Sequence, residues 1–229
     1  MNKNRVYKYQ DRGDIISHLA GLLSPQVSVS DYQNEMYSLG QLLADCIGNR
    51  VSINSSYCVV STAEDADFLA KGVIDGLLGK VKQVKLACFW NYHSTPINGG
   101  VSTAPIIKKF IETGAESSDN LIVVKSIISG SCVVKTNLTA LIESMDPKKI
   151  FILSPVMHVD AATKLESDFP KSISKRFDFE YLAMDKLRDP ETNEVSPGIG
   201  GSVYKLLGFG SQESKNNYTP ELVKARLFV

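Results

Sequence analysis

Short apolar runs that alternate with helical patterns constrain the fold of this chain more than any other feature of its sequence. Between the runs, apolar residues recur with the three- and four-residue spacing of helices. A strand that is covered on both faces reads as a continuous apolar run. The alternation therefore predicts an α/β protein with a doubly wound, mostly parallel sheet. The runs occupy residues 57–60, 84–90, 121–124, 150–153 and 177–183.

The first fifty residues predict a helical elaboration that precedes the sheet. Apolar residues repeat with helical spacing behind Asp14, and again behind Ser30 until Gly48. We therefore expect one domain, in which residues 1–50 form the elaboration and residues 51–229 form the α/β part. Further helices are expected over residues 61–79 (opening on a capping box of Ser61 and Glu64), 102–114, 132–145 and 161–169.

Composition and charge argue against several function classes. The 229 residues contain 25 Lys and Arg against 25 Asp and Glu, so the formal net charge is zero. That balance lacks the electrostatic footprint of a nucleic-acid binder, and we expect no nucleic-acid partner. No apolar run approaches the roughly 20 residues that cross a bilayer, so no membrane segment is expected. The four cysteines are far apart and form no CxxC, which argues against a metal site and indicates the reduced thiols of a cytoplasmic protein.

The segment from Lys125 to Cys132 joins a predicted strand to a predicted helix, at the edge of the sheet where ligands bind in such folds. Its small residues expose main-chain N–H groups at a helix N-terminus, which is an arrangement suited to phosphate. The segment also fits an ordinary turn with serine caps, and the sequence contains neither a P-loop nor a GxGxxG fingerprint. The candidate phosphate-binding residues are Lys125, Ser126, Ser129, Gly130, Ser131 and Cys132.

A second unusual segment runs from Val195 to Ser202 and contains one proline and three glycines. Glycines at such positions let the main chain approach a planar ligand closely and present its N–H and C=O groups. The alternative is a turn that precedes a short helix. Both readings stay open on the residues alone.

Three stretches match, in order, the motifs of one known family. Residues 60–63 (Val-Ser-Thr-Ala) lie where type I phosphoribosyltransferases have a Ser-Arg-Ala-Gly turn, and residues 123–132 lie where they have their phosphoribosyl-pyrophosphate loop. Residues 183–185 and 195–200 lie where uracil enzymes have an Ile-Asp pair and a Val-Pro-Gly-Leu-Gly loop. The chain from about residue 56 to 210 therefore resembles a type I phosphoribosyltransferase, and most closely uracil phosphoribosyltransferase.

The resemblance implies the type I phosphoribosyltransferase fold and a ligand with a 5′-phosphorylated ribose, either a nucleotide or phosphoribosyl pyrophosphate. It also implies a homodimer or another protein partner, and Mg²⁺ if the protein is catalytic. In the family, the first loop cradles the phosphate and the C-terminal loop holds the base. The residues that match the base-binding loop are Pro197, Gly198, Ile199 and Gly200, and Asp185 matches the acid that precedes it.

Departures from the family fall on the residues of the chemistry. Val124 and Lys125 stand where acids would bind the ribose hydroxyls, and neither side chain accepts a hydrogen bond; Thr62 stands where the family has an arginine. Preorganised cations normally stabilise departing pyrophosphate, so we expect weakened or lost transferase activity and a sensing or scaffolding role. The alternative is an active nucleobase phosphoribosyltransferase or N-glycosidic-bond enzyme with a rearranged site. Its candidate catalytic residues are His93, Glu64 and Asp185.

Overall fold

The centre of the molecule is one mixed β-sheet, seen in a computed structural model that describes residues 4–94, 102–189 and 194–227. The strands lie in the order β1-β8-β7-β5-β2-β3-β4, and β6 pairs with β7 beside that path. A separate two-stranded sheet is formed by β9 (Leu187–Arg188) and β10 (Val195–Ser196). The strands of the main sheet are β1 (Arg5–Tyr7), β2 (Ser56–Thr62), β3 (Gln83–Asn91), β4 (Ile106–Ile111), β5 (Asn120–Val124), β6 (Ile127–Ile128), β7 (Ile150–His158) and β8 (Phe177–Asp185).

The order of the parallel strands fixes where a ligand can enter. Strands β2, β3, β5, β7 and β8 pair in parallel, whereas β1 and β4 are antiparallel and lie at the two edges. The chain runs outward from β2 through β3 on one side and through β5, β7 and β8 on the other. The switch point is therefore between β2 and β5, and in such sheets ligands bind beyond the carboxyl ends of the strands at that point. This topology confirms the doubly wound, mostly parallel sheet.

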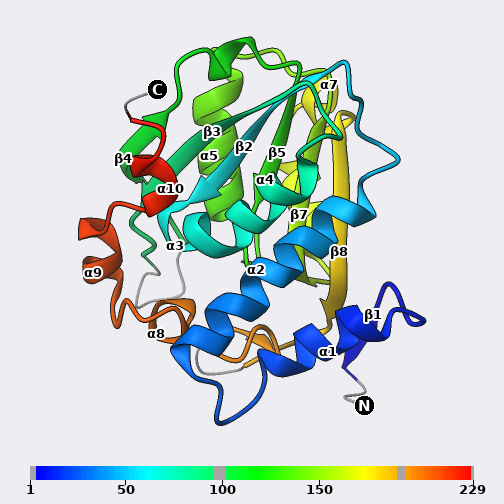
Figure 1. Cartoon of the computed structure of the whole chain (residues 1–229), viewed down its shortest axis with the longest axis vertical. Helices are drawn as coiled ribbons and strands as arrows, with labels where there is room; N and C mark the ends of the chain where they lie inside the picture. Colours follow the sequence, from blue (N-terminus) through cyan, green and yellow to red (C-terminus); the bar gives the residue numbers. More distant parts are fainter. Residues whose placement is uncertain (1–3, 95–101, 190–193, 228–229) are drawn as a thin grey trace.

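Helices cover both faces of this sheet (Figure 1). Helices α1, α2 and α4 contribute to the buried apolar cluster on one face, and α5 and α6 contribute to the cluster on the other. No helix of the described part of the chain is long and apolar enough to cross a membrane. The helices are α1 (Gly13–Gly21), α2 (Val29–Cys46), α3 (Ala63–Asp65), α4 (Lys71–Leu77), α5 (Cys132–Ile142), α6 (Ala161–Ser167), α7 (Lys171–Ser174), α8 (Val203–Leu206), α9 (Gln212–Asn217) and α10 (Glu221–Lys224), with a π-helical turn η1 (Ala66–Ala70) and a 3-10 turn η2 (Ala115–Ser117).

Alternate residues of the central strands supply the two clusters, because successive side chains of a strand point to opposite faces. In β2, Val59 packs with α2 and α4, while Cys58 and Val60 pack with α5. Ile15 of α1 and Leu43 of α2 belong to the same cluster as Val59. The expected N-terminal helical elaboration is therefore present, and its apolar side is packed against the sheet.

The prediction of a helix over residues 102–114 was wrong, because residues 106–111 form the edge strand β4. Apolar residues at positions 106, 107, 110 and 111 fit helical spacing. In the structure, Ile106 and Ile111 pack against one cluster and Phe110 against the other, so both faces of this strand are partly covered. Six residues are too few to distinguish helical from strand spacing, and here the pairing with β3 decides in favour of a strand.

Smaller differences concern the ends of elements. The capping box expected from Ser61 and Glu64 does not form: Ser61 lies in β2, and the Thr62 hydroxyl donates to the Asp65 carboxylate over 3.0 Å. Strand β1 was not predicted from the sequence, and β7 continues to His158, beyond the expected apolar run.

Candidate ligand site

A cavity of about 710 Å³ lies at the carboxyl ends of the central strands. Its walls come from the turn after β2, the residue that follows β5, the β6–α5 turn, and the segments around β9, β10 and α8. Its volume is in the range of pockets that hold small organic ligands. The described residues that line it are Glu64, His93, Ser102, Lys125, Ile127, Ile128, Ser129, Gly130, Cys132, Val133, Val134, Lys164, Arg188, Glu194, Val195, Ile199, Gly201, Ser202, Val203 and Tyr204.

Part of the predicted phosphate segment lies in the wall of this cavity. Strand β6 pairs with β7 and leads through the turn that contains Ser129 and Gly130 into α5, whose first residue is Cys132. These three residues line the cavity, whereas Ser126 and Ser131 are not among the described residues that do. The Ser126 side chain is fully buried, and its main-chain N–H donates to an Asp65 carboxylate oxygen over 3.2 Å.

Lys125 projects into the cavity wall but is already paired. Its Nζ lies 2.7 Å from Asp65 Oδ2 and 3.3 Å from Glu64 Oε1. Burial disfavours the charged ammonium, but the two carboxylates outweigh it and raise the pKa of Lys125 above its ordinary value. The amine therefore stays protonated, and its charge is balanced by acids of the β2–α3 turn.

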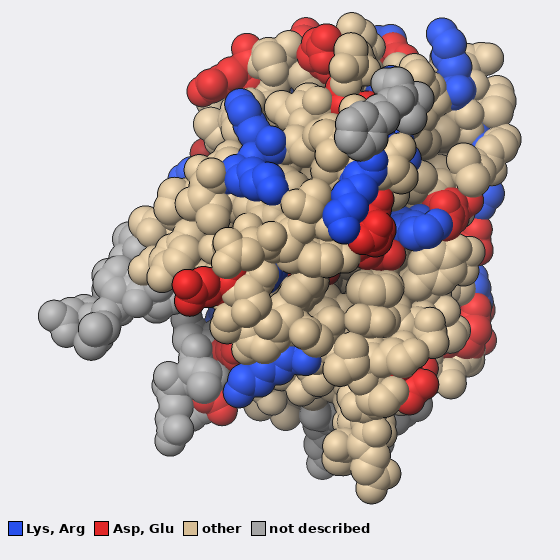
Figure 2. All heavy atoms as spheres, turned by 60° about the vertical axis from the view of Figure 1, so that its left-hand side comes forward, with Lys and Arg blue, Asp and Glu red and all other residues tan. Residues whose placement is uncertain are grey.

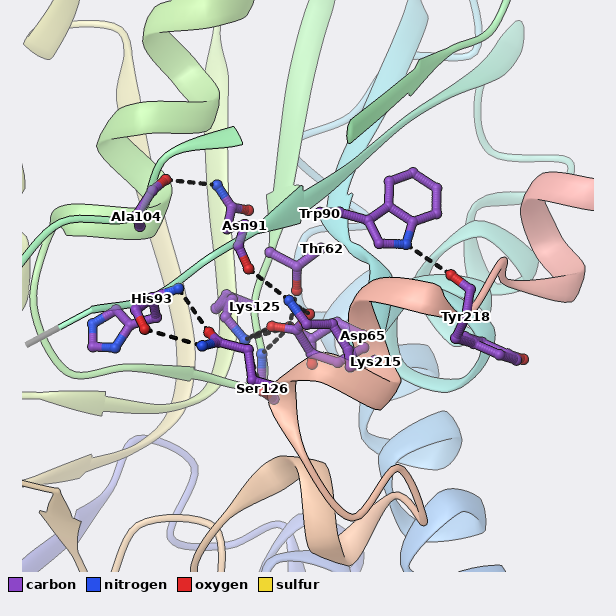
Figure 3. Close-up of polar contacts among 12 residues, drawn as sticks. Thr62, Asp65, Trp90, Asn91, His93, Ala104, Lys125, Ser126, Lys215 and Tyr218 are labelled. Atoms are coloured by element: carbon purple, nitrogen blue, oxygen red, sulfur yellow. Dashed lines mark hydrogen bonds and ion pairs between the residues drawn. The ribbon is translucent and has the colours of Figure 1, made fainter. Parts of the chain in front are cut away.

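A second buried lysine approaches Glu64 from the C-terminal tail, which we define as residues 211–227. Lys215 of α9 is 0% exposed, and its Nζ donates to the main-chain oxygen of Asn91 over 2.6 Å. The same Nζ lies 3.8 Å from Glu64 Oε2. Figure 3 shows Lys215 projecting from α9 and its hydrogen bond to the main chain of Asn91. Burial lowers the pKa of Lys215, and the charge of Glu64 partly opposes that shift.

The C-terminal tail is held over the end of β3 by several hydrogen bonds (Figure 3). The indole N–H of Trp90 donates to the main-chain oxygen of Tyr218 over 2.7 Å. The Gln212 amide pairs with both main-chain groups of His93, over 2.7 and 3.2 Å. Asp67 of η1 accepts from the Tyr218 hydroxyl. The tail is thus fastened beside the site, although none of its described residues lines the cavity.

His93 and Glu64, two of the three predicted catalytic residues, line the cavity together. The His93 side chain remains exposed, yet partial burial and then the charge of Lys125 lower its pKa. A lowered pKa favours the neutral imidazole, which is the form that can accept a proton. Cys132 is in the same wall, but burial raises the pKa of its thiol, so this helix start does not yield a thiolate.

Asp185, the third predicted catalytic residue, does not line the cavity within the described chain. It is 0% exposed, and Arg5 of β1 binds both of its carboxylate oxygens over 2.8 and 2.7 Å. The carboxylate also accepts the main-chain N–H of Gly198 over 2.8 Å, and Arg5 donates to the Gly198 oxygen. The Arg5–Asp185 pair therefore fixes the proline-glycine turn from behind.

The proline-glycine segment contributes some of its residues to the cavity. Ile199 lines it, and Pro197, Gly198 and Gly200 are not among the described lining residues. The Ser196–Pro197 bond is cis. Tyr32 of α2 donates its hydroxyl to the Ile199 main-chain oxygen over 2.9 Å, so the N-terminal elaboration helps to position this loop.

Two cations in the cavity wall were not found from the sequence. Arg188 of β9 lines the cavity and donates to the main-chain oxygen of Ser129, and Lys164 of α6 lines it as well. Each follows a predicted strand at the ligand-binding edge, which is the signal that would have found them. Lys215 gave no such signal, because α9 (Gln-Glu-Ser-Lys-Asn-Asn) is polar along its whole length.

The site supplies no ready protein ligands for a metal. Within residues 4–94, 102–189 and 194–227, no group of three or more His, Cys, Asp or Glu side chains is arranged to hold a metal ion. Glu64 and Asp65 are engaged by Lys125 instead. These residues therefore do not fit a protein-held Mg²⁺, and we derive no step through one.

No family model matches the sequence, and no curated protein matches it. Among solved structures, the AQ2163 protein of Aquifex aeolicus is similar with a TM-score of 0.65 and 12% identity, over 86% of this chain and 95% of that one. A hypoxanthine-guanine phosphoribosyltransferase of L. donovani has a TM-score of 0.43 at 10% identity, over 69% of this chain and 81% of that one. A hypothetical protein of Neisseria gonorrhoeae with bound ppGpp has a TM-score of 0.41 at 10% identity, over 77% of this chain and 93% of that one.

The likeness to the Aquifex protein shows a shared fold and nothing further, and the two lower TM-scores carry no argument. The doubly wound, mostly parallel α/β sheet and the N-terminal helices expected from the sequence are confirmed, and the resemblance to type I phosphoribosyltransferases stays a prediction. Because function depends on the site rather than the fold, what the protein does is argued from the cavity.

Proposed function

We propose that this protein binds a 5′-phosphorylated ribose compound, either a nucleotide or phosphoribosyl pyrophosphate, in the cavity at the ends of β2 and β5. The phosphate would sit at the turn of Ser129, Gly130 and Cys132, and the base would face the segment around Ile199. One observation carries the proposal: these two segments, about seventy positions apart in the sequence, line the same cavity. A closer relation to the uracil enzymes is part of the proposal, supported by the match at residues 195–200.

We further propose that transferase activity is weakened or lost and that the role is sensing or scaffolding. The position where an acid would hold the ribose carries Lys125, whose ammonium is paired with Asp65 and Glu64. Thr62, at the position of the family's arginine, donates its hydroxyl to Asp65. Lys125 is thus not free to stabilise departing pyrophosphate, and no arginine stands at position 62 to do so.

Binding is tested by thermal shift with phosphoribosyl pyrophosphate and a panel of nucleoside monophosphates. A ligand that binds only the folded state raises the melting temperature. An added Cβ at Gly130 meets open space, so Gly130→Trp should fill the cavity without a backbone clash and abolish the shift. Gly13→Trp is the matched control, because that glycine also faces open space but lies outside the cavity. A shift that survives in Gly130→Trp contradicts the phosphate assignment.

An active enzyme is the second candidate, because His93 and Glu64 share the cavity with Lys125. Purified protein with phosphoribosyl pyrophosphate, Mg²⁺ and a panel of nucleobases separates the two. We expect no release of pyrophosphate above the rate without protein. Release that disappears in His93→Asn would support the active alternative, in which the phosphates of the substrate would carry Mg²⁺ into the site.

A cytoplasmic location and a protein partner or second copy also belong to this proposal. The location is supported by Cys46, Cys58, Cys88 and Cys132, none of which forms a disulfide. On the side shown in Figure 2, basic and acidic side chains are interspersed, which favours a small ligand over nucleic acid.

A further inference from the structure

Glu64 is a buried carboxylate with an unused acceptor in the cavity wall. The residue is 5% exposed and lines the cavity. Among the residues that the structure describes, no group donates a hydrogen bond to its Oε2 atom. Burying a polar atom without a partner is costly, and nearly all buried polar groups in proteins have one. Oε2 itself exposes less than 1 Å², so a ligand in the cavity that Glu64 lines can donate to it only when the carboxylate turns toward that ligand.

The neighbours of Glu64 hold the carboxylate without satisfying it. Lys125 Nζ lies 3.3 Å from Oε1, on the side of β5, and Lys215 Nζ lies 3.8 Å from Oε2, on the side of the C-terminal tail. The hydrogen bonds of the two ammonium groups go elsewhere: Lys125 donates to Asp65, and Lys215 donates to Asn91. Two cations thus balance the charge of Glu64, and neither of them donates a hydrogen bond to Oε2.

The C-terminal tail makes this arrangement rigid. Lys215 is anchored through α9, whose Gln212 grips the main chain of His93. Asp67, in the turn that follows Glu64, accepts the main-chain N–H groups of Glu221 and Leu222 over 3.0 and 2.8 Å. Hydrogen bonds therefore anchor the tail both at α9, through Gln212, and at α10, through Asp67.

We propose that Glu64 accepts a hydrogen bond from a hydroxyl of the bound sugar, and that Lys215 is the positioning residue that holds it for this purpose. The inference rests on the proposed function, because it names the group that recognises the sugar of a sugar phosphate. The acceptor for the sugar is then on the β2–α3 turn, opposite the β5 end where Lys125 stands.

The test compares ribose 5-phosphate with inorganic phosphate by titration calorimetry. Both probes carry the phosphate, and only one carries hydroxyls. In Glu64→Gln we expect the preference for ribose 5-phosphate over phosphate to fall about tenfold or more, since a hydrogen bond to a charged group contributes that much. The affinity for inorganic phosphate itself should rise slightly in Glu64→Gln, because the substitution removes a negative charge that repels an anion. Glu213→Gln, an exposed change on α9, is the matched control and should leave both affinities unchanged.

A double-mutant cycle tests Lys215. Lys215→Met should reduce the preference for ribose 5-phosphate, and Glu64→Gln combined with it should reduce it no further, since the two act on one hydrogen bond. Lys224→Met removes an exposed cation from the same tail and controls for charge alone. Melting temperatures without ligand confirm that each variant is folded, and either single variant tests the proposal if the other fails to fold.

The outcomes separate the inference from the proposed function. If both probes bind and the preference for ribose 5-phosphate is unchanged in Glu64→Gln and Lys215→Met, the proposed function stands and the role of Glu64 is wrong. Full additivity of the two substitutions overturns the positioning role of Lys215. If the wild-type protein binds neither probe, the proposed function fails and the inference with it.

Discussion

At the scale of single residues, buried charged side chains of this protein form ion pairs that cannot be predicted from their positions in the sequence. Asp185 has the place of a ligand-facing acid, but Arg5, 180 positions earlier, binds both of its oxygens. A partner at that distance leaves no local signal. Lys125 and Glu64 were found because both lie directly behind predicted strands, where chain direction alone places side chains at the ligand edge. Lys215 was missed because only tertiary contacts bury it.

The Arg5–Asp185 pair should contribute strongly to stability. Removing one partner of a buried pair leaves an uncompensated charge, so Asp185→Asn should lower the free energy of unfolding by about 3–5 kcal/mol. Asp14 pairs with Arg12 on the surface, and Asp14→Asn is expected to have no measurable effect. Urea unfolding of the two variants and the wild type measures both. Equal stabilities of the two variants would show that Asp185 is not needed to hold the proline-glycine turn.

Cys58 should make stability fall at alkaline pH. Burial, and then the charge of Glu112, raise the pKa of its thiol to about 12. In the unfolded chain a thiol ionises near pH 8.5, so between these values the unfolded state releases a proton that the folded state keeps. The stability that Cys58 contributes is full below about pH 8.5 and falls by about 1.4 kcal/mol per pH unit above it. Unfolding at pH 8, 9 and 10 should give a shallower decline for Cys58→Ala, and parallel declines would contradict this assignment.

At the scale of elements, the last helix of the C-terminal tail is capped by one side chain of η1. Asp67 accepts the first main-chain N–H groups of α10 and the Tyr218 hydroxyl, and so acts as a cap supplied by another element. Loss of a cap costs about 1–2 kcal/mol, so Asp67→Ala should loosen residues 218–227 while the sheet stays folded. Hydrogen exchange should rise within residues 218–227 and not in β5 or β7. Glu213→Ala, on the exposed side of α9, should leave exchange as in the wild type.

Two glycines at positive φ test whether the loop before α8 is constrained by its surroundings: Gly200 lies in that loop, and Gly210 lies between α8 and α9. Gly200 has φ +92°, and an added Cβ would lie 2.3 Å from the Leu22 main-chain oxygen. Gly210 has φ +74°, and an added Cβ meets open space. Gly210→Ala should therefore cost only the left-handed backbone term, about 1–2 kcal/mol, and Gly200→Ala should cost more and weaken ligand binding. Equal losses in urea unfolding would mean that the main chain at Leu22, directly after α1, does not constrain this loop.

The elements themselves show where sequence patterns suffice. Strands β2, β3 and β5 and helices α2 and α5 were expected near their observed places, because long apolar runs and strong helical periodicity leave little choice. Strand β4 was not, since its six residues fit both spacings and only the pairing with β3 decides. Strand β1 has three residues and gains its order from the Arg5–Asp185 contact, which no local pattern records.

At the scale of the whole molecule, the alternation of apolar runs and helical patterns was enough to predict the sheet. It did not predict how the first fifty residues pack against that sheet. Tyr32 and Leu43 of α2 are fully buried in the cluster that also contains Val59 of β2 and Trp90 of β3. A helical elaboration that shares its core with the sheet has no independent core to retain when the sheet unfolds. The position of the Ile199 loop, held by Tyr32, therefore depends on the same core.

This shared core predicts that the protein unfolds in one cooperative step. Trp90 is the single tryptophan and is 0% exposed in the cluster beneath α2 and α4, so its fluorescence reports the loss of that core. Far-ultraviolet circular dichroism reports the helices of both faces. In urea the two signals should give the same midpoint and the same slope, as expected when no intermediate is populated. Leu43→Ala should lower both midpoints together, since truncating a buried leucine costs about 2–5 kcal/mol. If circular dichroism instead changed first while Trp90 fluorescence stayed native, residues 1–50 would unfold separately from the sheet.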